Sequence, residues 1–91
     1  MHARILSAAI SLSHTLGYEG VTRTRLARRL KCSEGLISYH FGTMAALRDA
    51  VMTSAIQTED FKLIAQGYLG KHPVALKAPV ELIRRAMSGA I

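Results

Sequence analysis

The segment from Thr22 to His40 concentrates side chains that can donate hydrogen bonds to an anion. Guanidinium, ammonium, hydroxyl, phenol and imidazole groups can all donate to phosphate oxygens. The donors in this segment are Thr22, Arg23, Thr24, Arg25, Arg28, Arg29, Lys31, Ser33, Ser38, Tyr39 and His40. Their types predict a surface that binds a polyanion.

The positive charge of the chain lies mainly in its first half. Residues 1–48 hold seven basic and two acidic residues, a net charge of +5, whereas residues 49–91 hold five basic and four acidic residues, a net charge of +1. Release of counterions from phosphates would give the first half affinity for a nucleic acid of any sequence. The alternative is that the bases only keep a small protein soluble.

Apolar residues recur at helical spacing along most of the chain, and no segment alternates with period two. We therefore expect an all-α fold of five or six short helices. The first helix should bury Ile5, Ala9, Leu12 and Leu16, the fifth should bury Phe61, Ile64, Ala65 and Tyr68, and the last should carry a stripe of Val80, Ile83, Met87 and Ala90. The expected ranges are residues 3–16, 23–30, 33–41, 44–57 and 59–69, and a last helix from Pro79.

Two of these helices should form a helix-turn-helix. Thr22 and Ser33 are hydroxyl residues at positions suited to N-caps. The small side chain of Ala27 permits an angled crossing, and Ile37 and Phe41 lie one turn apart on the inner side. The pattern predicts a three-helix, homeodomain-like core that is followed by short C-terminal helices.

With Ile37 and Phe41 turned inward, Glu34, Leu36 and Ser38 are directed outward. An exposed leucine is suited to the methyl group of thymine in a DNA groove. The alternative is that a single exposed leucine needs no functional explanation.

Residues 3–51 resemble the N-terminal DNA-binding domain of the TetR family of bacterial repressors. The Tyr39–Gly42 segment is the most diagnostic part. The residues that carry the resemblance are the runs Ile5–Ala9, Gly17–Thr22, Leu26–Leu30, Ser38–Gly42 and Ala46–Leu47.

The resemblance implies roles for individual residues on double-stranded DNA. Positions that approach phosphates are Thr22, Arg23, Tyr39 and His40. Positions that approach bases are Thr24, Glu34, Gly35, Leu36 and Ser38. Ser33, the cap of the second helix of the motif, and Lys31, as a possible phosphate contact, complete the predicted DNA-binding set.

The sequence departs from the family pattern in three ways. Lys31 occupies the position of the usual turn glycine, and Met44 replaces a lysine at the start of the next helix. Only about forty residues follow that helix, too few for the family's large ligand-binding domain, so we expect no small-molecule inducer.

We expect a DNA-binding domain at residues 1–56 and a short helical extension at residues 57–91 that forms a homodimer. The expected dimer interface is Val80, Ile83 and Met87. The alternative is that this stripe belongs to the core of its own chain.

The function predicted is that of a sequence-specific, ligand-independent transcriptional regulator, a repressor, in the cytoplasm. Two alternatives remain open: a protein-interaction module such as an adaptor or anti-repressor, and an accessory factor for DNA architecture or recombination. An enzyme is not expected, because neither His40 nor Cys32 has a catalytic partner nearby in the sequence. No cofactor, metal ion, signal peptide or membrane segment is expected.

Overall fold

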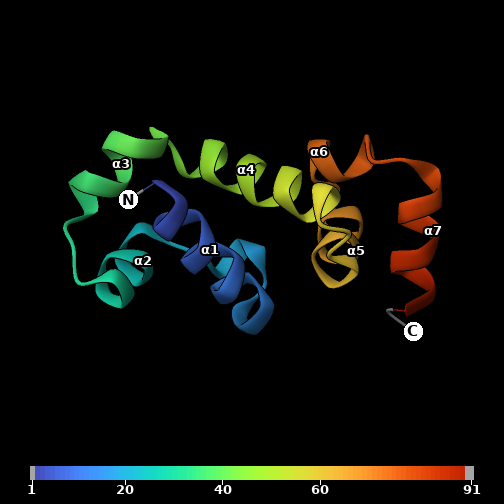
Figure 1. Ribbon diagram of the computed structural model, residues 1–91, viewed down its shortest axis with the longest axis horizontal. Coiled ribbons are helices and arrows are strands. Elements are labelled where there is room, and N and C mark those ends of the chain that lie inside the picture. Colours follow the sequence, from blue (N-terminus) through green and yellow to red (C-terminus); the bar gives the residue numbers. More distant parts are fainter. Residues whose placement is uncertain (1, 90–91) are drawn as a thin grey trace. The chain divides into compact units, whose positions relative to one another are not determined.

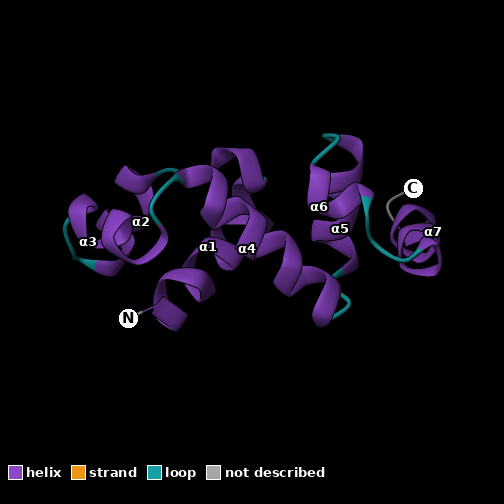
Figure 2. Cartoon of the chain, turned by 90° about the horizontal axis from the view of Figure 1, so that it is seen from above, coloured by secondary structure: helices purple, strands orange, loops and turns teal. Residues whose placement is uncertain are grey.

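In a computed structural model that describes residues 2–89, every regular element is a helix (Figures 1 and 2). The all-α prediction is confirmed. The expected number of five or six helices is wrong, because seven α-helices and one 3₁₀ helix lie in the described range. They are α1 (His2–Leu16), η1 (Tyr18–Gly20), α2 (Arg23–Leu30), α3 (Glu34–Phe41), α4 (Met44–Gln57), α5 (Phe61–Leu69), α6 (Pro73–Leu76) and α7 (Val80–Gly89).

The chain forms two compact units, Met1–Val51 and Met52–Ile91. The first contains α1, η1, α2, α3 and the start of α4. The second contains the end of α4 and the three helices that follow. Each unit has its own set of buried apolar side chains.

The core of the first unit is built from side chains of α1, α2, α3 and α4. Ile5 and Ala9 of α1, Leu26 of α2 and Leu47 of α4 have no exposed surface, and Ile37 of α3 is 1% exposed. Burying an apolar side chain of this size stabilises the fold by about 1.5–3 kcal/mol. These contacts therefore fix how α2 and α3 pack on α1.

The inner face of α1 differs from the prediction at its end. Leu16 is 47% exposed, whereas Ser13 is fully buried and donates its hydroxyl to the carbonyl of Ala9 at 2.7 Å. Ser13 tolerates burial because this bond satisfies its only donor. Leu16 is the last residue of the helix, so its side chain lies beside the following turn, close to Gly20.

The turn after α1 continues into η1 rather than forming an irregular connector. Gly17 has φ +81°, a conformation that glycine adopts without strain. Tyr18 is buried, and its hydroxyl lies 3.4 Å from a carboxylate oxygen of Glu19. Burial, and to a lesser degree the neighbouring Glu19 carboxylate, raises the pKa of Tyr18, so this phenol stays protonated.

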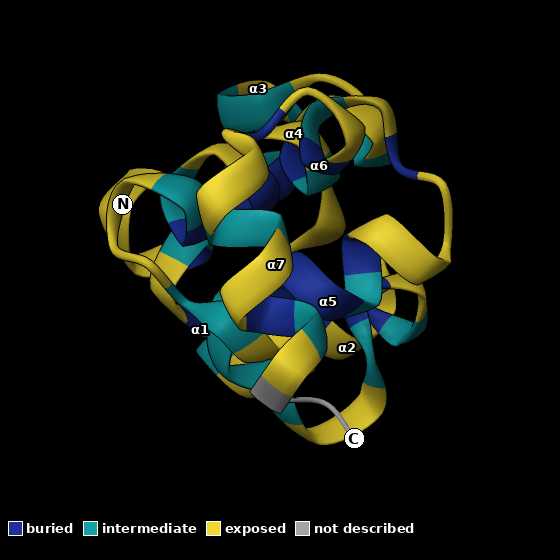
Figure 3. Ribbon diagram, turned by 90° about the vertical axis from the view of Figure 1, so that its right-hand side faces the viewer, coloured by how far each residue is buried: buried dark blue, intermediate teal, exposed yellow. Residues whose placement is uncertain are grey.

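In the second unit α5 packs against α7, and the buried face of α5 lies beneath α7 in Figure 3. Leu63, Ile64, Ala65 and Gly67 form that face. The expected inner positions Phe61 and Tyr68 are respectively half-buried and 38% exposed. The prediction was wrong at these two positions, because the small residues Ala65 and Gly67 and the aliphatic Leu63 and Ile64 form the buried face instead of the aromatic rings.

The segment at His72 and Pro73, which lies between two of the expected helices, begins the additional helix α6. Nδ1 of His72 accepts a hydrogen bond from the backbone N–H of Val74 at 3.2 Å, and Pro73 occupies the first turn. Proline suits that position because its missing N–H would have no helical partner there. His72 therefore takes part in both helix ends, since its own backbone N–H donates to the carbonyl of Gly67 in α5 at 2.8 Å.

Gly67 permits close packing within the second unit. A Cβ atom at this position would lie 2.7 Å from Cβ of Ala75 and 2.7 Å from Sδ of Met52. Such distances are well inside van der Waals contact, so α5 approaches α6 and the end of α4 more closely than any other residue would allow.

The helix α7 buries Ala86 and leaves Ile83 and Met87 half-buried, while Val80 is 81% exposed. Ala90, which was expected to extend this stripe, lies outside the described residues. The outer face carries Glu81, which pairs with Arg84 and Arg85.

Among the described residues, none of the helices combines the length and apolar character needed to cross a membrane.

Candidate nucleic-acid interface

The first part of the site is the start of α2, where Thr22 is the N-cap. Its side-chain oxygen accepts a hydrogen bond from the backbone N–H of Arg25 at 3.2 Å, as the sequence predicted. The hydroxyl proton of Thr22 is not used in this bond, so it remains available to an external acceptor. Thr24 is exposed one residue inside the helix.

Arg23 connects the start of α2 to the end of α3. Its Nη2 atom lies 3.4 Å from the carbonyl oxygen of Gly42, the residue that ends α3. Arg48 supports the same region, since its Nη2 atom donates to the carbonyl of Val21 at 3.2 Å. A guanidinium has five N–H donors, so Arg23 keeps several for a phosphate group.

The turn between α2 and α3 is closed by Lys31 in the left-handed conformation, with φ 55° and ψ 47°. The N–H of Cys32 donates to the carbonyl of Ala27 at 3.0 Å, and the N–H of Lys31 lies 3.4 Å from the carbonyl of Arg28. These two bonds form a Schellman motif, which usually has glycine at the position of Lys31. Lys31 is exposed at this turn, and its left-handed backbone conformation is strained because the residue has a Cβ atom.

We expect Lys31→Gly to raise the free energy of unfolding by about 1 kcal/mol, because glycine adopts the left-handed conformation without a clash of its side chain. Urea denaturation followed by circular dichroism measures the change. Lys31→Ala is the matched control, since it removes the same charge and keeps the Cβ atom. Equal stabilities of the glycine and alanine variants would show that the turn is not strained.

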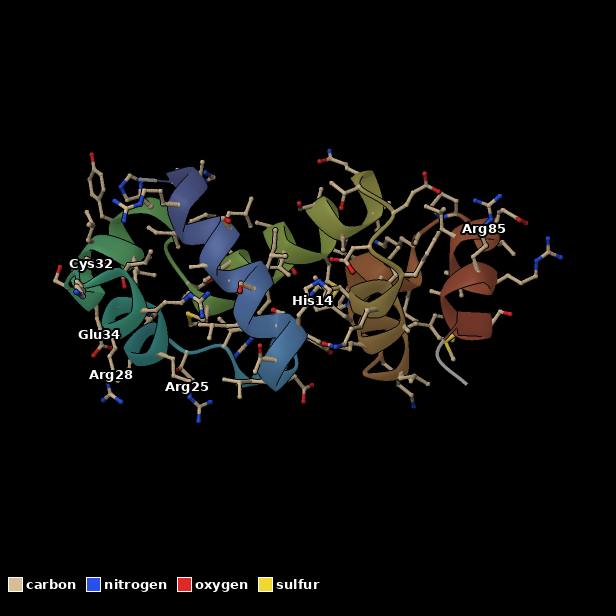
Figure 4. The ribbon with its side chains drawn as sticks, turned by 60° about the horizontal axis from the view of Figure 1, so that its bottom comes forward. His14, Arg25, Arg28, Cys32, Glu34 and Arg85 are labelled. Carbon is tan, nitrogen blue, oxygen red and sulfur yellow. The ribbon has the colours of Figure 1, made fainter. Side chains whose placement is uncertain are left out.

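The start of α3 presents polar groups outward. Ser33 is the N-cap, and its side-chain oxygen accepts from the N–H of Leu36 at 3.1 Å. Glu34 and Gly35 are exposed in the first turn, and Glu34 projects away from the ribbon in Figure 4. Leu36, predicted to be exposed, is half-buried, as is Ser38. The buried neighbour of these residues, Ile37, fixes the rotation of α3.

Several aromatic rings lie together at the end of α3, and some of them are exposed. Tyr39 is 83% exposed, and its ring lies edge-on to the ring of His40 with centroids 5.3 Å apart. The ring of His2, from the start of α1, stacks on Phe41 with centroids 4.2 Å apart and lies 6.3 Å from His40. These contacts place the phenol and imidazole groups at one end of the helix.

Phe41 was predicted to be buried, and this prediction was wrong. Its ring is half-buried, because it stacks on the ring of His2, which is itself exposed. His2 is exposed and was not part of the predicted site. No spacing rule could have found it, since it precedes His40 by 38 positions and meets it only in the folded unit. His2 adds an imidazole beside the predicted phosphate donors.

The structure brings the predicted DNA-binding residues of the first unit into three adjacent segments: the start of α2, the turn, and α3. Thr22, Arg23 and Thr24 lie in the first and Lys31 in the second. Ser33, Glu34, Gly35, Leu36, Ser38, Tyr39 and His40 lie at or within α3. Arg25 and Arg28 project outward from α2 (Figure 4), so the surface beside these segments is basic.

The predicted dimer residues Val80, Ile83 and Met87 all lie on α7 in the second unit. They are separate from the three segments above. Within the described part of the chain, no group of three histidine, cysteine or acidic side chains is gathered for a metal ion.

Residues 5–51 match the family of bacterial regulatory proteins described as the tetR family. Comparisons with curated proteins and with solved structures gave no match. The matched segment covers more than half of the 91 residues and contains the whole helix-turn-helix, which is a DNA-binding domain of regulators rather than of enzymes. The resemblance inferred from the sequence motifs is confirmed, and the chain belongs to the tetR family of bacterial regulatory proteins.

Proposed function

We propose that the protein is a cytoplasmic repressor that binds one inverted-repeat site on duplex DNA as a homodimer. The observation that carries this proposal is the juxtaposition of α3, whose Tyr39 is 83% exposed, with the capped start of α2. A helix of this kind reads bases in the major groove, while donors at its ends and on the preceding helix contact phosphates. Each protomer would read one half-site.

The proposed division of labour follows the position of each side chain. Thr22, Arg23, Lys31, Tyr39 and His40 contact phosphates, which sets the register without reading sequence. The base-reading group is Thr24, Glu34, Gly35, Leu36 and Ser38, and Ser33 caps the helix that carries most of them. The glycine lets the backbone approach the base edges, and Glu34 can accept from the amino group of cytosine.

We expect Arg23→Ala to weaken binding to every duplex by roughly tenfold, because it removes one charged phosphate contact from each half-site. Leu36→Ala should instead lower the preference for the selected site over a scrambled one by a factor of about five. Fluorescence anisotropy with duplexes selected from a random pool measures both. Equal losses on all duplexes for both variants would refute the division of labour.

Dimerisation is proposed through residues 57–91, which would form an arm separate from a DNA-binding domain at residues 1–56. Several large apolar side chains of this region are exposed, and burying them against a second copy of the chain would stabilise a dimer. They are Tyr68, Leu69, Leu76 and Val80. Val80 lies one turn before Ile83 on α7, so a partner helix that covers one also contacts the other.

Val80→Glu should convert the dimer to a monomer, with a dissociation constant raised at least about tenfold, because a buried unpaired carboxylate opposes association. Sedimentation velocity at several protein concentrations measures the change. Thr53→Glu is the comparison, since it adds the same carboxylate at an exposed position of α4 that lies outside residues 57–91. A monomeric parent protein, or a dimer that survives Val80→Glu, would exclude this interface.

The protein is further proposed to act without an inducer bound in its second unit. The packing at Gly67 supports this, because even one added carbon atom would clash with Ala75 and Met52. Helices packed this closely leave no space for a ligand at the point where Gly67 meets Ala75 and Met52.

A further inference from the structure

A groove between α1 and α2 is lined by residues that the proposed function does not use. Its volume is about 330 Å³, and its lining consists of Arg4, Ser7, Ala8, Ser11, Arg29 and Leu30. Arg29 is one of the anion donors of the segment from Thr22 to His40, but none of the six is assigned a DNA contact in the proposed function. We propose that this groove is an anion site that holds a phosphate group. This site does not depend on whether α3 binds DNA as proposed.

The face of α1 that forms one wall carries donors at helical spacing. Arg4, Ser7 and Ser11 are separated by three and four residues, so their side chains project from one face of the helix. Arg4 and Ser7 are exposed and Ser11 is half-buried. The small Ala8 between them is buried and leaves the space that the groove occupies.

The opposite wall carries Arg29, whose side chain reaches across to α1. Its Nη2 atom donates to the side-chain oxygen of Ser11 at 3.0 Å, which joins the two helices across the groove. This bond uses one of five guanidinium donors and leaves the hydroxyl proton of Ser11 free to donate. The groove is therefore arranged for an acceptor before any ligand arrives, which reduces the entropy lost on binding.

The charge of the groove is not compensated by its own lining, which contains two guanidinium groups and no carboxylate. Arg4 has no hydrogen-bond or ion-pair partner among the described residues. Two guanidinium groups and two hydroxyls suit a phosphate group, which is negatively charged and has several acceptor oxygens, since guanidinium pairs with phosphate through parallel hydrogen bonds.

The test is a titration of the full ¹⁵N-labelled chain with sodium phosphate, at ionic strength held constant with sodium chloride. We expect saturable shifts of the backbone amides of Ser7, Ser11, Arg29 and Leu30. Arg4→Gln and Arg29→Gln should each weaken the affinity for phosphate by roughly tenfold or more. Arg28→Gln is the matched control. Arg28 immediately precedes Arg29 on α2, is exposed and does not line the groove.

Two sources could supply the phosphate group, and a second titration with duplex DNA in dilute salt separates them. If the duplex shifts the same groove amides and free phosphate competes with it, the group is a DNA backbone phosphate. If the duplex leaves these amides unchanged and phosphate still binds, the group belongs to a small phosphorylated molecule. If no duplex binds but phosphate does, the anion site stands and the proposed function fails.

The proposal is overturned if phosphate produces no saturable shifts in the groove of the parent protein. It is equally overturned if Arg28→Gln weakens phosphate binding as much as Arg4→Gln and Arg29→Gln do.

Discussion

Ile37→Ala is expected to destabilise the DNA-binding unit by about 2–5 kcal/mol, because it leaves a cavity where a side chain 1% exposed now packs. The total stability of a small domain is about 5–15 kcal/mol, so a large share of the protein would be unfolded at physiological temperature. Ile37 is the only side chain of α3 that is buried in the described unit. The loss should therefore release the recognition helix itself.

Urea denaturation followed by far-ultraviolet circular dichroism measures this loss. Tyr39→Ala is the control on the same helix, since it removes a larger side chain that is 83% exposed. It should change the free energy of unfolding by no more than about 0.5 kcal/mol. If the two variants lost similar stability, α3 would not be held by Ile37 as described.

The affinity for duplex DNA is expected to fall about 100-fold as salt rises from about 50 to about 200 mM. This figure follows from four cationic phosphate contacts in a dimer, two from Arg23 and two from Lys31, and a logarithmic slope of about −0.9 for each. A single protomer on DNA would give half that slope, and hence a fall of only about tenfold. The slope therefore reports the number of protomers bound as well as the chemistry of the contact.

Equilibrium anisotropy at a series of salt concentrations measures the slope. Lys31→Gln should reduce it by about two in a dimer. Lys62→Gln, an exposed base on α5 outside the DNA-binding unit, should leave it unchanged. Binding that does not depend on salt would exclude the phosphate contacts and favour a protein partner for this surface.

Local chemistry made much of the fold predictable. Thr22 and Ser33 were identified as N-caps from their positions alone, and each accepts the expected backbone N–H. The boundaries of α2 and α4 were also predicted, since capping and glycine or lysine stop signals act within a few residues. The strain at Lys31 could be anticipated because the turn needs a left-handed residue whatever its side chain.

The errors arose where packing between helices overrides local pattern. Ser13 is buried and Leu16 is not, because the end of α1 meets η1 rather than a flat apolar surface. Tyr68 lies outside and Gly67 inside, because α5 needs a small residue where it meets Ala75. His72 donates its backbone N–H to the carbonyl of Gly67 at the end of α5 and also caps the start of α6, and no α6 was expected from the sequence.

For the candidate site, sequence motifs identified the segments but not the contacts between them. The bond from Arg23 to Gly42 and the stack of His2 on Phe41 join residues that are 19 and 39 positions apart, respectively. Both depend on how α1, α2 and α3 pack together. The groove between α1 and α2 was invisible for the same reason, since Arg4 and Arg29 belong to separate patterns in the sequence.

The exposure of Tyr39 makes α3 visible to ultraviolet spectroscopy without a label. The chain contains no tryptophan and three tyrosines, so its intrinsic emission comes from tyrosine alone. Tyr18 is enclosed in the first unit, whereas the Tyr39 ring lies almost entirely in solvent. The surface proposed to meet DNA thus contains its own optical reporter.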